Sequence, residues 1–148
     1  MATEQVYFDD VEPGDDISPV TKAPTREQIK AYLGVGGEIQ PGSYRFFDDA
    51  AAQREGVRAA MVPGSLSVTM LAQVLTDWAA PAGRLRKLEV NFRRLAEPDD
   101  PLLCRGVVID KEVVDGEGHV RIDVAIDNQR TNDSPTVGTA VVILPMRS

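Results

Sequence analysis

The clearest pattern in the chain is a series of apolar residues at helical spacing near its middle. They recur at steps of three and four residues, as Leu66, Met70, Leu71, Val74, Leu75 and Trp78. This spacing predicts a helix over about 65–78 with an apolar face wide enough to be deeply buried. Ser65 can cap its first turn, and Pro81 and Gly83 can end it. Trp78 is expected to make a core or dimer contact rather than stack on a ligand.

After residue 85 the spacing of the apolar residues changes from helical to alternating. Leu88, Val90 and Phe92 alternate with Lys87, Glu89, Asn91 and Arg93. Alternation of this kind predicts a strand with one solvent-exposed face. Three further strand-like runs follow, at 102–114, 119–129 and 136–144. Turn-forming residues at 115–118 and 132–135 predict hairpins between these three strands.

The first third of the chain predicts shorter elements. We expect a short strand within 7–15, a helix through Ile29 that Thr25 caps, and a second short helix over 46–55. Helices that precede a succession of strands are typical of an α+β fold with an antiparallel sheet. With 148 residues and no internal repeat or linker, the chain fits one domain over 1–148.

The charge and cysteine content of the chain bear on whether it binds nucleic acid or a metal ion. The formal net charge of −7 argues against nucleic acid as the main partner, although a small anion could still bind local basic residues. Cys104 is the only cysteine, so we expect a packed thiol and no cysteine metal cluster. We predict no metal site.

The uncharged stretch over 59–76 raises the question of a membrane span. Pro63, Gly64 and several polar residues interrupt it, which favours a buried helix with a loop before it. No apolar amino-terminal segment with a basic leader is present. We therefore expect a cytoplasmic protein with no membrane association.

One loop carries a motif. Residues 36–43 read Gly-Gly-Glu-Ile-Gln-Pro-Gly-Ser, which resembles a loop of the MaoC-like hydratase/dehydratase family that usually reads Ser-Gly-Asp-x-Asn-Pro-Ile-His. Gly37 and Pro41 match. Glu38, Gln40 and Ser43 stand where the family has Asp, Asn and His. The segments 8–15, 61–66 and 74–81 are also similar to the family, so the resemblance spans nearly the whole chain.

The resemblance implies a fold and a ligand class. The fold is a hot-dog domain, in which an antiparallel sheet wraps around a long central helix. The ligand is an acyl thioester such as an acyl-coenzyme A, bound as substrate and without a separate cofactor. In the family, the loop Asp and His handle the proton and the water, and a backbone N–H at the start of the central helix suits the thioester oxygen. That last role carries over to Gly64 or Ser65.

Because Glu38 and Ser43 replace the family's Asp and His, the sequence leaves open which residues would transfer protons. Ser43 has no useful basicity near neutral pH, and the only histidine, His119, is expected to lie exposed at a strand start far from the loop. Glu38 could act as a single acid-base group if burial raised the pKa of its carboxyl. The alternative is a loop-capping or exposed carboxylate. Gln40 could equally brace the loop, and Ser43 could cap the next segment.

A basic cluster flanks the strand after the central helix. It comprises Arg84, Arg86, Lys87, Arg93 and Arg94. Arg86 and Arg93 are candidates to bind the phosphates of coenzyme A or an acidic carrier protein. The alternative is a solvated strand face whose charges balance nearby acidic residues.

The favoured function is that of a lyase acting at the 2,3 double bond of an acyl thioester, like an enoyl-coenzyme A hydratase or 3-hydroxyacyl-thioester dehydratase. Two alternatives remain open: a non-catalytic hot-dog subunit that supports an active MaoC-like partner, and an enzyme with another reaction on a carbonyl compound. Because an open sheet leaves an edge, we expect a homodimer, or a heteromer with an intact relative. The acyl group, its carrier and the reaction direction are not predicted.

Overall fold

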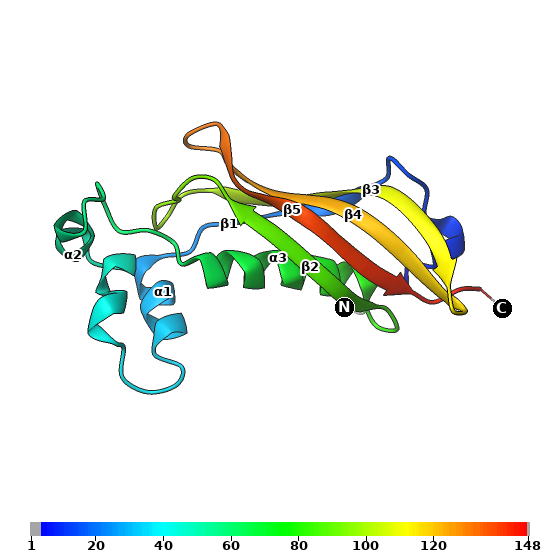
Figure 1. Ribbon diagram of the computed structural model, residues 1–148, viewed down its shortest axis with the longest axis horizontal. Helices are drawn as coiled ribbons and strands as arrows, with labels where there is room; N and C mark the ends of the chain where they lie inside the picture. Colours follow the sequence, from blue (N-terminus) through cyan, green and yellow to red (C-terminus); the bar gives the residue numbers. More distant parts are fainter. Residues whose placement is uncertain (1–3, 148) are drawn as a thin grey trace.

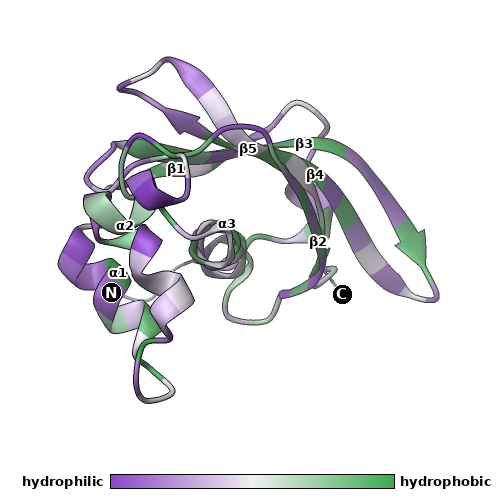
Figure 2. Cartoon of the chain, turned by 60° about the vertical axis from the view of Figure 1, so that its left-hand side comes forward, coloured by the Kyte–Doolittle hydropathy of each residue, from purple (hydrophilic) through white to green (hydrophobic). Residues whose placement is uncertain are grey.

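The computed structural model describes residues 4–147 and has one long helix held by a curved sheet. The helix, α3 (Gly64–Ala79), lies along the concave face of a five-stranded antiparallel sheet whose strand order is β1-β3-β4-β5-β2 (Figure 1). Figure 2 views α3 nearly end-on, with the sheet curving around it. Met70, Leu71, Val74 and Leu75 are buried on its sheet-facing side. The α+β fold, its central helix and its antiparallel sheet are therefore confirmed.

The sheet has five strands, and the long central ones, β3 and β4, alternate between buried and less buried side chains over much of their length, as the sequence pattern predicted. Their bounds are β1 (Asp16–Lys22), β2 (Arg84–Phe92), β3 (Leu102–Val114), β4 (Glu117–Asn128) and β5 (Asp133–Leu144). In β4, for example, Val120, Ile122 and Val124 are buried, whereas Arg121 and Asp123 are exposed. The inward side chains of β3, β4 and β5 join those of α3 in one core. Trp78 packs against this core, as expected.

One of the two predicted hairpin turns is confirmed and the other is displaced. Asp115 and Gly116 have φ values of 50° and 80°, the backbone that a two-residue hairpin turn requires, and they join β3 to β4. The second turn was expected at 132–135 but lies at 129–132, with Asn132 at φ 57°. The residues after Asn132 pair within β5, so turn-favouring composition alone placed this turn three residues too late.

The strand expected within 7–15 is wrong. Phe8–Asp10 forms a short 3-10 helix, and β1 begins only at Asp16. Phe8 is held by packing, because its ring lies where a side chain at Gly118 would stand and its N–H donates to the Pro145 carbonyl at 2.9 Å. β1 is an irregular edge strand containing Pro19 beside a register shift, which hides it from the alternation pattern.

Three short helices project beyond the start of α3 and form the helical extension, residues 26–54 (Figure 1). They are α1 (Arg26–Leu33), the 3-10 helix η2 (Pro41–Phe46) and α2 (Asp49–Arg54). Thr25 caps α1 as predicted, in a reciprocal pair of hydrogen bonds with Gln28. Asp48 caps α2 by accepting the Ala50 N–H. Residues 55–63, the approach segment, then lead into α3.

Two further expectations concern what the chain lacks. Among residues 4–147, no helix is long and apolar enough to cross a membrane, and α3 is instead a core helix. Within the same residues, no cluster of three His, Cys, Asp or Glu side chains could hold a metal ion. The predicted domain over 1–148 extends past the described residues at both ends. Inside them, sheet and α3 share one core.

Candidate functional site

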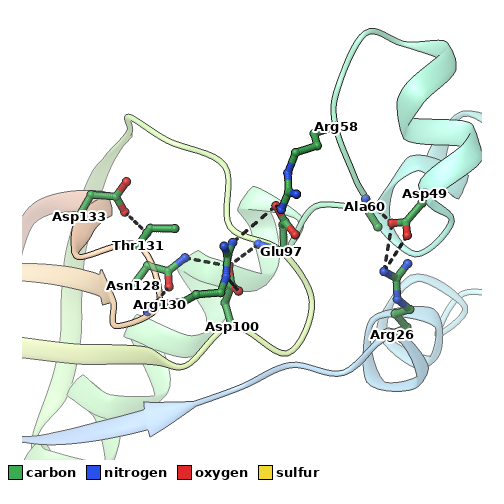
Figure 3. A network of polar contacts seen from close by, with 10 residues as sticks. All are labelled: Arg26, Asp49, Arg58, Ala60, Glu97, Asp100, Asn128, Arg130, Thr131 and Asp133. Carbon is green, nitrogen blue, oxygen red and sulfur yellow. Dashed lines mark hydrogen bonds and ion pairs between the residues drawn. The ribbon is translucent and has the colours of Figure 1, made fainter.

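The approach segment is fixed on one side by a carboxylate of the helical extension. Asp49 of α2 accepts hydrogen bonds from the Arg26 guanidinium of α1 at 3.0 Å and from the Ala60 N–H at 2.8 Å (Figure 3). The Ala60 N–H and the Arg26 guanidinium together hold the pKa of the Asp49 carboxyl below its usual value. One side chain thus joins α1, α2 and the residues that lead into α3.

A second polar network fixes the approach segment to the sheet. Arg58 pairs with Glu97 at 2.5 Å, and Glu97 also lies 3.5 Å from Arg130 (Figure 3). The Asp100 side chain is only 4% exposed and accepts from Arg130, from the Asn128 amide at 2.8 Å and from the Glu97 N–H at 2.8 Å. Burial alone would raise the pKa of Asp100, but these hydrogen bonds hold it below its usual value. The start of α3 is therefore held from both sides.

The first turn of α3 has unused backbone donors. Pro63 is the N-cap residue and offers no side-chain cap, while its carbonyl accepts the N–H groups of Leu66 and Ser67. Within residues 4–147, the N–H groups of Gly64 and Ser65 donate no hydrogen bond. The expectation that Ser65 caps the helix is wrong, because the fixed φ of Pro63 lets the helix start immediately after it. A helix start with free N–H groups favours an oxygen that carries negative charge.

Two aromatic side chains that sequence reasoning did not select flank this turn. The Tyr32 hydroxyl of α1 donates to the Ser65 Oγ at 2.7 Å. The ring of Phe92, at the end of β2, lies 3.0 Å from where a Cβ at Gly64 would stand, and Phe92 is 56% exposed. Each is more than 25 positions away along the chain. The sequence placed Phe92 on the apolar face of the predicted strand, and only the structure shows that it is exposed at the strand end.

A groove runs beside the first turns of α3. Its volume is about 420 Å³, and it lies between α3, the end of β1 and the start of α1. Leu66 and Met70 supply its apolar wall on α3, with Pro24 opposite. Lys22 crosses it by donating to the Gln73 side chain at 2.9 Å. The groove therefore begins one residue past Ser65, at Leu66, and reaches along α3 to Gln73.

The motif loop lies apart from the start of α3. Glu38 and Gln40 are exposed, and Ser43 is half-buried in η2. Within the described part of the chain, neither the Glu38 carboxylate nor the Gln40 amide forms a hydrogen bond or an ion pair. The burial that would activate Glu38 is absent from the single chain, where its carboxylate takes the exposed position given as the alternative. The N–H of Ser43 donates to the Gln40 carbonyl, so this contact is a backbone turn and the expected side-chain brace and cap are not formed.

The basic residues do not form one cluster. Arg86 lies near the start of β2 and Arg93 just past its end, about 20 Å apart along an extended chain. Arg84 pairs with Glu117 at 2.6 Å and Lys87 with Glu89 at 3.1 Å. Of the two candidates for phosphate binding, only Arg93 is near the start of α3, because it follows Phe92. The ion pairs of Arg84 and Lys87 agree with the alternative of a strand face whose charges are balanced by nearby acidic residues, and phosphate binding by Arg93 stays a prediction.

His119 cannot complete the motif loop. It lies in β4, in register with Glu112 of β3, and its ring nitrogen is 4.0 Å from Glu117. Its side chain is only 16% exposed, so the expected solvent-exposed position is also wrong. Its side chain lines a small surface hollow together with Glu112 and Arg121.

Comparison with known proteins supports the fold. No protein-family model matches the sequence, and no curated protein is significantly similar to it. Solved structures do match. The (R)-hydratase PhaJ1 of Pseudomonas aeruginosa, in its unliganded form, is 19% identical, with a TM-score of 0.80 over 97% of this chain and 88% of that chain. A MaoC-like dehydratase of Rhodospirillum rubrum is 19% identical, with a TM-score of 0.79 over 97% of this chain and 99% of that chain.

A third match belongs to a complex of two different proteins. The ChsH1–ChsH2 complex of Mycobacterium tuberculosis contains a chain that is 16% identical, with a TM-score of 0.74 over 90% of this chain and 98% of that chain. These alignments cover almost whole chains. At such low sequence identities they show a shared fold and do not show a shared reaction. This chain therefore has the hot-dog fold of MaoC-like hydratases and dehydratases.

Proposed function

We propose that this chain binds an acyl thioester with the thioester oxygen at the start of α3, and that it adds or removes water at the 2,3 double bond. The observation that supports this most is the pair of free N–H groups on Gly64 and Ser65, held in place by two polar networks. The groove beside Leu66 offers space for an acyl chain. The structural likeness to hydratases and dehydratases favours the same ligand class.

The chemistry needs donors for the oxygen and one group that transfers a proton. As water adds at C3, negative charge develops on the thioester oxygen, and the Gly64 and Ser65 N–H groups stabilise it. Glu38 is the proposed base: its carboxylate takes a proton from water and returns that proton to C2, so the carboxylate is regenerated. Gln40 and Ser43 are proposed to orient the loop. Arg93 is proposed to attract the phosphates of a coenzyme A carrier, with Arg86 too distant to share that role.

The exposure of Glu38 limits this proposal to an assembled protein. Glu38 is exposed in the single chain, and a second subunit is what would cover it. We propose a homodimer that pairs a sheet edge and brings a partner surface to the loop. β1 and β2 are the two edges of the sheet in the described residues.

A second candidate function follows from the same loop. Since the Glu38 and Gln40 side chains form no hydrogen bond or ion pair within residues 4–147 and no histidine is near, the chain could be a binding subunit that supports an active partner. The match to one chain of a two-protein complex gives this alternative a structural precedent. In that case the start of α3 would still bind thioesters, but turnover would come from the partner's loop.

The test is hydration of a panel of 2-enoyl-coenzyme A thioesters by the purified protein, with Glu38→Gln in parallel. Turnover by the parent that falls at least a hundredfold in Glu38→Gln, with thioester binding retained, supports the lyase. Arg86→Gln is the matched control, an exposed charge away from α3 that should leave turnover unchanged. Thioester binding without turnover by any variant supports the binding subunit. A parent that neither binds nor turns over thioesters contradicts both.

A further inference from the structure

Two hydroxyl groups from distant parts of the chain meet at the start of α3. Tyr32 lies in the last turn of α1 and Ser65 in the first turn of α3, 33 positions apart, and the Tyr32 O–H donates to the Ser65 Oγ at 2.7 Å. Ser65 is exposed, whereas Tyr32 is half-buried. Their contact lies beside the free N–H groups described above.

The position of Tyr32 does not depend on this hydrogen bond. The capping box of Thr25 and Gln28 starts α1, and Ile29 is fully buried beneath it. Arg26 ties the same helix to Asp49, which also holds the approach segment through the Ala60 N–H. These contacts fix α1 against the start of α3. The phenol hydroxyl is therefore an added polar contact on a scaffold that is already held.

The Tyr32 phenol is more acidic than the Ser65 alcohol, so it is the better donor in the 2.7 Å contact between them. With the Ser65 Oγ as acceptor, its own proton is left to donate elsewhere, and within the described chain no acceptor lies in reach of it. Side chains in a helix point back toward its N-terminus, which places the Ser65 Oγ on the side of the free N–H groups. The Ser65 carbonyl is already used by the Thr69 hydroxyl at 2.9 Å.

We propose that Tyr32 is a positioning residue that holds the Ser65 hydroxyl as a third donor, aimed at the thioester oxygen bound at the start of α3. This inference rests on the proposed function and names residues that the motif loop does not contain. The Ser65 O–H touches the ligand oxygen, and Tyr32 acts only through Ser65. Since charge on that oxygen grows toward the transition state, an oriented donor lowers the barrier more than it tightens substrate binding.

The expected effects follow from these two roles. Removing one oriented donor of this kind costs roughly a hundredfold in kcat, which is the loss expected for Ser65→Ala. Tyr32→Phe keeps the ring and removes one oxygen, so Ser65 stays but loses its orientation. We expect about a tenfold fall in kcat with KM changed less than about twofold. Tyr32→Phe together with Ser65→Ala should be no slower than Ser65→Ala alone, because Tyr32 acts through Ser65.

The experiment measures kcat and KM on 2-enoyl-coenzyme A thioesters for the parent, both single variants and the double variant. Calorimetric binding of saturated butyryl-coenzyme A is measured for the same proteins, where Ser65→Ala and Tyr32→Phe should both weaken binding. Tyr44→Phe is the matched control: it removes a phenol oxygen from the same helical extension, and within residues 4–147 that oxygen makes no hydrogen bond. It should leave all values unchanged.

The outcomes separate this inference from the proposed function. If the parent binds or turns over thioesters and Tyr32→Phe matches it in both assays, the role of Tyr32 is overturned and the proposed function stands. Effects of Tyr32→Phe and Ser65→Ala that multiply in the double variant also overturn it, since they would then act independently. A parent without turnover and without butyryl-coenzyme A binding overturns both ideas.

Discussion

The ring of Phe92 lies against Gly64, so closely that a Cβ at position 64 would come within 3.0 Å of it. The contact joins the end of β2 to the first turn of α3. The contact explains why glycine fits at position 64, because any side chain there would collide with the ring beside the free N–H groups. The end of the edge strand β2 is thus in direct contact with the proposed thioester site.

Gly64→Ala should therefore affect ligand binding more than stability. Phe92 is 56% exposed, so its ring can turn toward solvent, and we expect the free energy of unfolding to change by less than about 1 kcal/mol. The added methyl group and the displaced ring would crowd the helix start. We expect the affinity for butyryl-coenzyme A to fall about tenfold, measured by calorimetry alongside urea unfolding.

Phe92→Ala provides the control for Gly64→Ala. With the ring removed, the same methyl group finds open space, so Gly64→Ala should weaken binding much less in the Phe92→Ala background. An equal loss of affinity in both backgrounds would show that crowding by the ring is not the cause.

Gly138→Ala should behave in the opposite way. A Cβ at position 138 of β5 would lie 2.0 Å from the Glu89 carbonyl oxygen, which is backbone of the paired strand β2 and cannot move without breaking the pairing. We expect a loss of at least about 2 kcal/mol in the free energy of unfolding, from urea titration. Gly42→Ala is the control, because a Cβ there meets nothing within 4 Å. Similar stability of the two variants would contradict the close β2–β5 approach.

The sequence predicted best what depends on neighbouring residues. The three- and four-residue spacing from Leu66 to Trp78 predicted α3, and alternation predicted β2 and its apolar face, because both periods follow directly from backbone geometry. β1 was missed since an edge strand with Pro19 and a register shift shows neither period. Its pairing with β3 depends on residues 80 or more positions away.

The candidate site was predicted only in part. Gly64 and Ser65 were selected through a family resemblance, and the structure places both on the exposed start of α3. Tyr32 and Phe92 were not selected, since their contacts with Ser65 and Gly64 cross 33 and 28 positions and no local pattern reports such contacts. The strand predicted after residue 85 already implied that the basic residues would be spread along an extended chain, as the structure shows. Spacing in sequence translates into distance only once the element is known.

Acid should weaken the protein through its buried carboxylate. The pKa of Asp100 in the folded protein is held below its usual value, so its contribution to stability is fully present above about pH 4, the unfolded-state pKa. That contribution is lost as pH falls through the lower folded-state pKa. Asp100→Asn should cost about 2 kcal/mol in the free energy of unfolding at pH 7, since it removes charged hydrogen bonds.

The difference between Asp100→Asn and the parent should shrink as pH falls below about 4, because the parent then also loses the charge. Asp99→Asn is the control: Asp99 is exposed, and asparagine tolerates its φ of 70°. A difference between Asp100→Asn and the parent that stays constant from pH 7 to pH 3 would contradict the role of the carboxylate charge.

Cys104 should report the opening of the sheet edge. Burial raises the pKa of its thiol to about 11, so at pH 8 only about a thousandth is thiolate, and the side chain is fully buried. Cys104 pairs in register with Val20 of β1, the irregular edge strand. We therefore expect the native protein to resist a disulfide reagent for hours at pH 8, and to react fully once guanidinium unfolds it.

The same thiol should detect release of β1 alone. Urea far below the unfolding midpoint should already raise the labelling rate, because we expect β1 to detach before the core unfolds. A variant that moves the thiol to an exposed position of β1, Cys104→Ala with Ser18→Cys, should label within minutes. Rapid labelling of native Cys104 would contradict its burial, and labelling that rises only with global unfolding would contradict the separate release of β1.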